Sequence, residues 1–237
     1  KRQTADRAYL VNRVAAEKYP DAKFTAFGGL CLNRPVGGLN PDAVETSLKL
    51  GAKVIWLPTN TAENHYRKNG KDPSKGVVVT RDGKAVDELQ DIFALVKQYN
   101  AVLATGHIGA EECFPVVEAA RAAGVKKIVI THPEFWVVGM TPEQQADIVR
   151  KYDVLLESVY AQPVNGNYKI NIPDNIAAMK AIGPEHFVLS TDSGQTVNPY
   201  WYESYTTYFK AVSEAFTPEQ VRKMTHDNPA WLLDIDQ

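Results

Sequence analysis

The sequence is poor in cysteine, in net charge and in long apolar stretches. Its 237 residues include two cysteines, Cys31 and Cys113, and carry a formal net charge of −2. Cysteines outside a C-x-x-C pair favour a reducing compartment, and balanced charge lacks the basic surface that nucleic acids need. No apolar run reaches the length of about 18 residues that a membrane-spanning helix requires. We therefore expect a cytoplasmic protein without a nucleic-acid or membrane partner. The sequence leaves open whether the chain forms a homo-oligomer.

Glycine motifs that bind phosphate are also missing. Neither G-x-G-x-x-G nor G-x-x-x-x-G-K-[ST] follows any apolar segment, so nothing indicates an open, nucleotide-binding sheet. The hydrophobic fraction of 44% is ordinary for a soluble chain with one substantial core. We expect a single domain over residues 1–237.

Short apolar segments alternate with helix-like segments along most of the chain. The apolar residues run on without a polar residue at every second position, which is typical of strands buried on both faces of a parallel sheet. The expected strands are 24–33, 53–59, 101–108, 127–133, 153–159 and 187–193. The expected helices are 41–50, 85–99, 110–123, 142–152 and 173–182. Such repeated units indicate a parallel α/β fold.

The repeated units favour a closed (β/α)8 barrel of the TIM type. Such a barrel has eight units in about 250 residues, whereas fewer strands are visible here. The chain opens on KRQTADRAYLV without methionine and enters an amphipathic helix whose cap would be Thr4 or Asp6. We therefore expect the domain to be N-terminally incomplete, with its first two strands and first helix upstream of Lys1.

The interval 60–84 interrupts this regular alternation. It reads NTAENHYRKNGKDPSKGVVVTRDGK, is mostly polar and carries RDG between two short β-like runs. It predicts a long loop with a small hairpin between the fourth strand and the fourth helix. Long loops at this end of a barrel commonly shape the active site.

The residues that end the expected strands indicate metal chemistry. In a barrel the carboxyl ends of all strands meet at one rim. The residues at this rim are Asn33, Thr59, His107, His132, Glu157 and Asp192. Imidazole nitrogen and carboxylate oxygen bind zinc and similar ions, and a metal-bound water attacks electrophilic carbon near neutral pH. Either histidine alone would be read as structural, but the recurrence of His107 and His132 with Asp192 favours a metal site.

Several other polar residues are weaker candidates for substrate binding or for orienting a ligand. Asn33 and Thr59 belong to this group through their position at the rim. For Glu157 the sequence leaves three roles open: a metal ligand, a partner that orients a histidine, or an acidic residue at the rim without either role. His65 lies in the polar loop, where a solvated side chain is favoured over one that reaches the site. Arg34 is the one arginine placed at the rim, where it could hold an anionic group.

The aromatic run NPYWYESYTTYF, residues 198–209, follows the last expected strand. It could line a substrate pocket beside Asp192. Its spacing, however, is that of a helix that packs its aromatic side chains against a sheet. We expect the packing role.

The order of the rim residues resembles the amidohydrolase superfamily of metal-dependent barrel hydrolases. With the last strand counted as the eighth, His107 ends the fifth strand, His132 the sixth and Asp192 the eighth. The segment TPEQVRKMTHDNPAWLLDI, 217–235, is similar to that superfamily's closing helices. The segment GGLCLNRPVGGLNPDAVETSLKLGAKVIWLPT, 28–59, resembles an uncharacterised amidohydrolase-related branch.

The resemblance implies a divalent metal, zinc before others, as one or two ions. His107 and His132 would be ligands, and Asp192 would be both a ligand and the general base. Two positions depart from the superfamily pattern. Its first-strand His-x-His pair is not in this sequence and would precede Lys1. Thr59 stands where many members carry a bridging lysine, which favours one ion or a different bridge.

These inferences converge on a metal-dependent hydrolase. It would activate water for attack on a carbon–nitrogen or ester-type bond of a small molecule. A metal-dependent decarboxylase or lyase on the same barrel is the first alternative. A barrel that binds a ligand without catalysis is the second.

Overall fold

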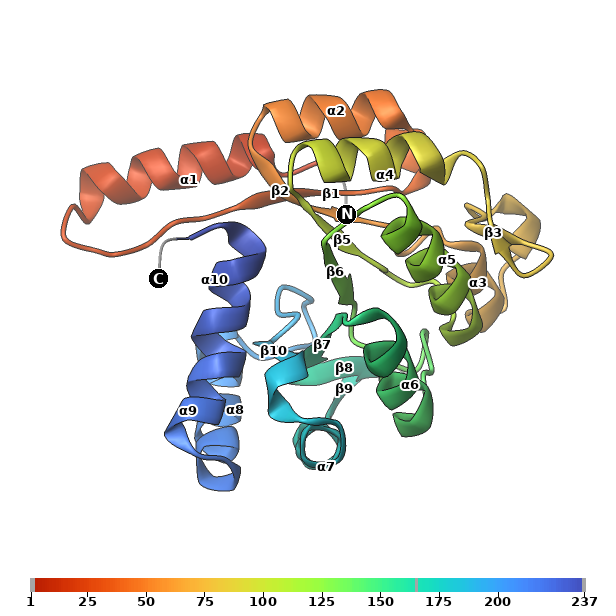
Figure 1. The fold of residues 1–237 in the computed structure, drawn as a ribbon. Helices are drawn as coiled ribbons and strands as arrows, with labels where there is room; N and C mark the ends of the chain where they lie inside the picture. The colour runs from red at the N-terminus through yellow and green to blue at the C-terminus, as the bar shows by residue number, and fades with distance from the viewer. Residues whose placement is uncertain (1–2, 165, 236–237) are drawn as a thin grey trace. The chain divides into compact units, whose positions relative to one another are not determined.

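A computed structural model describes residues 3–164 and 166–235 of the chain (Figure 1). It contains two compact units, Lys1–Val129 and Ile130–Gln237. Each unit combines parallel strands with helices. Across the described ranges, no helix has the length and apolar character to cross a membrane.

The first unit is built on four parallel strands. In spatial order they are β1 (Gly28–Cys31), β2 (Ala52–Trp56), β5 (Val102–Ala104) and β6 (Lys127–Ile130), whose last residue begins the second unit. The register aligns Leu30, Ile55, Leu103 and Ile128 in one row. All four side chains are buried. This row forms the centre of the core, and burial on both faces explains why the apolar residues run without alternation.

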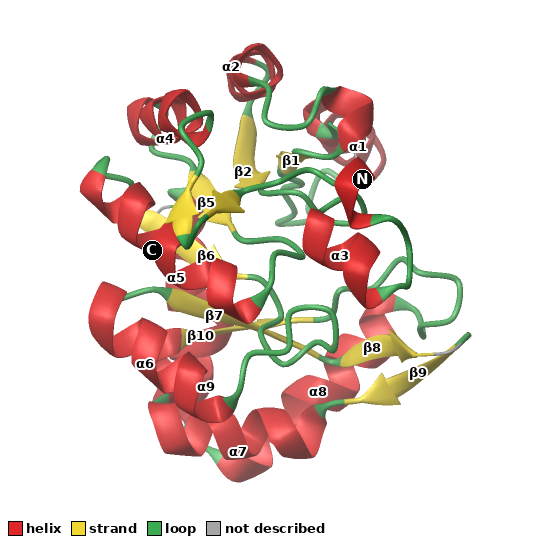
Figure 2. Ribbon diagram, turned by 90° about the vertical axis from the view of Figure 1, so that its right-hand side faces the viewer, coloured by secondary structure: helices red, strands yellow, loops and turns green. Residues whose placement is uncertain are grey.

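Helices surround these strands. They are α1 (Ala5–Lys18), α2 (Pro41–Lys49), α3 (Glu63–Lys68), α4 (Leu89–Gln98) and α5 (Ala110–Ala122), with short 3-10 turns η1 (Arg34–Val36) and η2 (Pro73–Lys75). Figure 2 shows α2, α4 and α5 along one face of β2, β5 and β6. The side chain of Asn40 caps α2 by accepting from the Ala43 amide. Thr4 precedes α1, but its Oγ1 accepts from the Gly29 amide at 3.0 Å and ties α1 to β1.

The strands are shorter than the sequence predicts. Phe24 and Phe27 are exposed, and β1 begins only at Gly28. β5 ends at Ala104, and the chain then turns through Gly106, whose φ is +65°. His107 therefore stands in a turn beyond the strand.

The polar interval after β2 contains more structure than a loop with a hairpin. Its hairpin consists of β3 (Thr80–Arg81) and β4 (Lys84–Ala85), joined by Asp82 and Gly83, which both have positive φ as tight hairpin turns require. Helix α3 was not predicted. The expected start of the next helix at residue 85 is wrong, because Lys84–Ala85 pairs as a strand and α4 begins at Leu89.

The second unit contains one parallel strand pair, β7 (Leu155–Val159) beside β10 (Phe187–Ser190). An antiparallel hairpin, β8 (Ala161–Val164) and β9 (Asn167–Ile170), follows β7. The helices are α6 (Pro142–Tyr152), α7 (Ile172–Ile182), α8 (Trp201–Ala215), α9 (Pro218–Arg222) and α10 (Asn228–Leu233), with a short 3-10 turn η3 (Pro184–His186) and a short π-helix η4 (Lys223–Asp227).

The aromatic run 198–209 divides between the core and the surface. Tyr208 of α8 is fully buried, as a packing role requires, whereas Tyr200 and Trp201 are 71% and 67% exposed. The Tyr208 hydroxyl shares a hydrogen bond of 2.7 Å with Ser158 Oγ and accepts another of 2.7 Å from Asn175 Nδ2. Tyr208 therefore joins α8 to β7 and α7.

Removal of this hydroxyl is expected to destabilise the protein. Tyr208→Phe leaves Asn175 and Ser158 buried with one partner fewer, which costs about 1–3 kcal/mol of unfolding free energy. Urea unfolding followed by circular dichroism measures the loss. Tyr202→Phe, at a tyrosine that is 51% exposed, is the matched control and should change nothing measurable. Equal stability of the two variants would contradict a structural role for the Tyr208 hydroxyl.

Candidate functional site

His107 and His65 form a pair at the carboxyl end of the strands in the first unit. His107 follows β5, and His65 lies on α3. Their Nδ1 atoms are 2.8 Å apart, the ring centroids 4.9 Å apart, and the ring planes differ by 20°. The rings therefore meet edge to edge, with a hydrogen bond between the two Nδ1 atoms. Because one Nδ1 donates and the other accepts, the outer nitrogen of each ring is its Nε2.

Main-chain contacts fix the position of His107. Its amide donates to Pro58 O at 3.0 Å, and its carbonyl accepts from Nδ2 of the buried Asn64 at 3.1 Å. The preceding Gly106 lies so close to the neighbouring chain that a Cβ would sit 2.5 Å from Leu57 O. The turn that carries His107 is thus held from both sides by residues that follow β2.

Asn33 and Thr59 are hydrogen-bonded to each other. The amide nitrogen of the buried Asn33 donates to Thr59 Oγ1 at 2.7 Å. Its Oδ1 accepts from the Thr59 amide, the Thr61 amide and Thr61 Oγ1 at 3.0, 3.1 and 2.9 Å. This network joins the ends of β1 and β2, and it accounts for the polar residues at both strand ends.

His132 and Asp192 share an unusual backbone conformation in the second unit. His132 comes two residues after β6 and Asp192 two residues after β10, with φ of +27° and +48°. The other described non-glycine residues with positive φ follow helices or turn a hairpin: Asp82, Asn100, Asp153 and Asp234. Positive φ is uncommon for residues with a side chain and is concentrated at functional sites. His132 and Asp192 are the two described cases that follow strands.

Glu157, on β7, lies beside both of these residues. Its carboxylate accepts a hydrogen bond from the His132 backbone amide, and the Asp192 carboxylate is close enough to repel it. Burial, with a smaller contribution from Asp192, raises the pKa of Glu157 to about 7. Asp192 itself accepts from Gln195 Nε2 at 3.2 Å. Glu157 is thus hydrogen-bonded to the main chain of His132 and feels the charge of Asp192.

Glu134, two residues after His132, is not among the residues predicted from the sequence. Burial raises the pKa of this carboxyl group to about 8, and its neighbours Glu157 and Asp174 add to the shift. It accepts a hydrogen bond from the Val159 amide, while its Oε1 has no partner among the described residues. Its acidic side chain in THPEF was the available signal, but burial of an acid is not visible in the sequence.

The side chains of His107, His132 and Asp192 are of types that bind metal ions, but they do not form a complete metal site. His107 and His132 offer imidazole nitrogen and Asp192 a carboxylate, which are typical zinc ligands. Within residues 3–164 and 166–235, however, no three His, Cys, Asp or Glu side chains are grouped so that they could hold an ion. The described residues therefore fit part of a metal site.

Comparison with known sequences places most of the chain in one family. A family model described as "Family of unknown function (DUF6282)" matches residues 1–157. No curated protein matches the sequence.

Solved structures share the fold across nearly the whole chain. An amidohydrolase from Pseudomonas aeruginosa is 12% identical, with 97% of this chain and 83% of that chain covered and a TM-score of 0.61. An uncharacterised TIM-barrel protein from Bordetella bronchiseptica is 16% identical, with 98% and 72% covered and a TM-score of 0.58. A 2,6-dihydroxybenzoate decarboxylase from Rhizobium is 15% identical, with 98% and 78% covered and a TM-score of 0.53.

Identities this low show the fold alone. The α/β barrel class predicted from the sequence is confirmed, and so is the resemblance to amidohydrolases at the level of the fold. The similar structures include a protein named as an amidohydrolase and one named as a decarboxylase. The fold therefore leaves the reaction to be argued from the residues of this chain.

Proposed function

This chain belongs to the family of unknown function DUF6282, and we propose that it is a metal-dependent hydrolase. Its substrate would be a small molecule with a carbon–nitrogen or ester-type bond. The observation that carries the proposal is the recurrence of ligand-type residues just beyond parallel strands. His107 follows β5, His132 follows β6 and Asp192 follows β10. In barrel enzymes the active site lies at these strand ends.

His107, His132 and Asp192 would be among the ligands of the ion. A bound zinc-type ion would supply Lewis acidity and lower the pKa of water. The left-handed backbone at His132 and Asp192 supports their assignment, because such strain persists where the surrounding structure imposes it for a function. Zinc is the preferred ion, and one or two ions are compatible with this donor set.

Asp192 would act as the general base. Its carboxylate accepts the proton from the attacking water and later delivers it to the leaving group. The hydrogen bond from Gln195 Nε2 orients one carboxylate oxygen. The neighbouring Glu157 would hold the His132 main chain through its accepted hydrogen bond, and thereby set the direction of that imidazole.

His65 would position His107. The hydrogen bond between the Nδ1 atoms fixes the ring of His107, and Nε2 would be the nitrogen that binds the ion. Histidines that bind metal commonly use their second nitrogen in this way. The sequence favours a solvated His65, whereas the 2.8 Å contact gives this side chain a defined partner.

Metal content tests the proposal. The protein, with any segment that precedes Lys1, is stripped with a chelator, reloaded with zinc and measured by mass spectrometry of the metal. We expect stoichiometric zinc in the wild type and loss of zinc in the His107→Ala, His132→Ala double variant. The matched control is His186→Ala with His226→Ala, which removes two histidines from η3 and η4. Retention of zinc by the first double variant would reject the ligand assignment.

Decarboxylation is the second candidate function. The fold likeness to the Rhizobium decarboxylase, over 98% of this chain, is the observation that favours it. Incubation of the zinc-loaded protein with small amides, esters and aromatic carboxylates distinguishes the two. Release of carbon dioxide from the carboxylates, without turnover of amides or esters, would replace the hydrolase proposal. No turnover of any of them would favour a ligand-binding barrel.

A further inference from the structure

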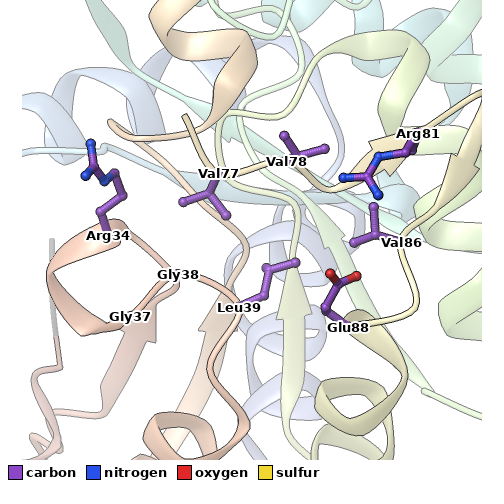
Figure 3. Close-up of a pocket in the computed structure, with 9 residues that line it drawn as sticks. All are labelled: Arg34, Gly37, Gly38, Leu39, Val77, Val78, Arg81, Val86 and Glu88. Atoms are coloured by element: carbon purple, nitrogen blue, oxygen red, sulfur yellow. The ribbon is translucent and has the colours of Figure 1, made fainter. Parts of the chain in front are cut away.

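A pocket opens in the first unit between two segments that follow strands (Figure 3). Its volume is about 410 Å³. All lining residues come from 34–39, directly after β1, and from 77–88, in the long connection after β2. The pocket therefore belongs to the end of the strands at which barrel proteins bind their ligands. None of the residues proposed above to hold the metal lines it.

Two arginines give this pocket a positive charge. Figure 3 shows Arg34 and Arg81 on opposite sides of Val77 and Val78, with the Arg81 guanidinium directed toward Val86. Glu88 is the one lining acid. The Arg81 guanidinium makes no hydrogen bond or ion pair with another described residue. Two cations against one carboxylate favour an anionic ligand.

The two segments that form the walls of the pocket, 34–39 and 77–88, are both hydrogen-bonded to residues 61–63. The Arg34 amide donates to Thr61 Oγ1 at 2.9 Å, and its Nη1 donates to Lys75 O at 3.3 Å. On the other wall, the Val77 amide donates to Thr61 O at 2.7 Å, and Val77 O accepts from the Glu63 amide at 3.0 Å. The distance between the walls is thereby set before a ligand arrives, which lowers the entropic cost of binding.

Two glycines shape one edge of the pocket. Gly37 and Gly38 have φ of +93° and +70°, a left-handed turn that residues with side chains avoid. A Cβ on Gly37 would lie 2.7 Å from Asn40 Nδ2, which caps α2. The main chain therefore lines this edge, and Leu39 and Val86 add apolar surface.

We propose that this pocket binds a small organic carboxylate with an apolar body. The carboxylate pairs with the unengaged fork of Arg81, while Arg34 adds positive potential from the opposite side. The apolar body packs on Val77, Val78 and Val86. This site is separate from the proposed metal ligands and does not depend on the proposed function.

Calorimetry with benzoate as the probe tests the proposal. Benzoate should bind saturably, and its neutral isostere benzamide at least about tenfold more weakly, since a charged hydrogen bond contributes that much. Arg81→Ala should weaken benzoate binding about tenfold, and Arg81→Lys by less, because lysine keeps the charge but not the fork. Arg13→Ala, at an arginine on α1 that contacts Tyr9, is the matched control and should bind as the wild type.

Three results would overturn the proposal. The first is equal binding of benzoate by the wild type and Arg81→Ala, with folding checked by circular dichroism. The second is equal affinity for benzamide or for inorganic phosphate, which would exclude a carboxylate site. The third is loss of benzoate binding in the His107→Ala, His132→Ala variant, which would place the carboxylate at the proposed metal centre. Unchanged binding in that variant supports a separate site.

Discussion

Gly106→Ala is expected to lower the free energy of unfolding by about 2–5 kcal/mol. Gly106 has φ of +65°, and a Cβ there would lie 2.5 Å from Leu57 O and 2.7 Å from Pro58 O. Both oxygens are backbone atoms, so the turn after β5 must move away from the end of β2. Urea unfolding followed by circular dichroism gives the difference in stability.

Gly70→Ala is a closely matched control. Gly70 has φ of +64°, and a Cβ there would meet nothing within 4 Å. Its replacement therefore reports the backbone strain alone, about 1–2 kcal/mol. The larger loss at Gly106 would measure the close packing of the two strand ends. Equal losses at both positions would show that the turn carrying His107 is not held by β2.

His65→Ala is expected to weaken zinc binding by about 10–100-fold, which is typical when a group that orients a metal-binding histidine is removed. The His107 ring would lose its Nδ1 partner at 2.8 Å and would rotate more freely about its side-chain bonds. Calorimetric titration of the chelator-stripped protein with zinc measures this loss. Nitrogen NMR of the histidine rings should also show a change in the tautomer of His107.

Two further variants separate positioning from a merely structural role. His65→Asn keeps an amide group that can accept from or donate to His107 Nδ1, so it should restore most of the zinc affinity. His226→Ala, on η4 of the second unit, should leave affinity and tautomer unchanged. If His107→Ala lowers zinc affinity but His65→Ala does not, only the positioning role is wrong. If His107→Ala has no effect, the ligand assignment itself is wrong.

Local sequence signals predicted several helices and the alternating order of strands and helices along the chain. Helix α6 begins and ends where the sequence indicates, because Thr141 caps it, Pro142 occupies its first turn and Gln144 completes the capping box. Continuous apolar segments likewise predicted parallel strands. The placement of histidine and aspartate just beyond these strands is also readable from the sequence, since strand direction alone decides which end a residue occupies.

Other features depend on contacts between distant parts of the chain. The start of α4 was predicted too early, because the pairing of β4 with β3 competes with local helix propensity. His65 and His107 are 42 residues apart, and only the packing of α3 against the turn after β5 brings their rings together. No periodic pattern encodes such a contact.

By itself, the sequence determined a parallel α/β barrel class with histidine and aspartate residues just beyond its strands, because periodicity, caps and strand direction are local properties. The tertiary structure decided which of these residues are strained, buried or paired. The left-handed backbone at His132 and Asp192, the buried carboxyl group of Glu134 and the charge of the Arg34–Arg81 pocket all arise there. The physical reason is that burial and hydrogen bonding depend on chain segments that meet only when the protein is folded.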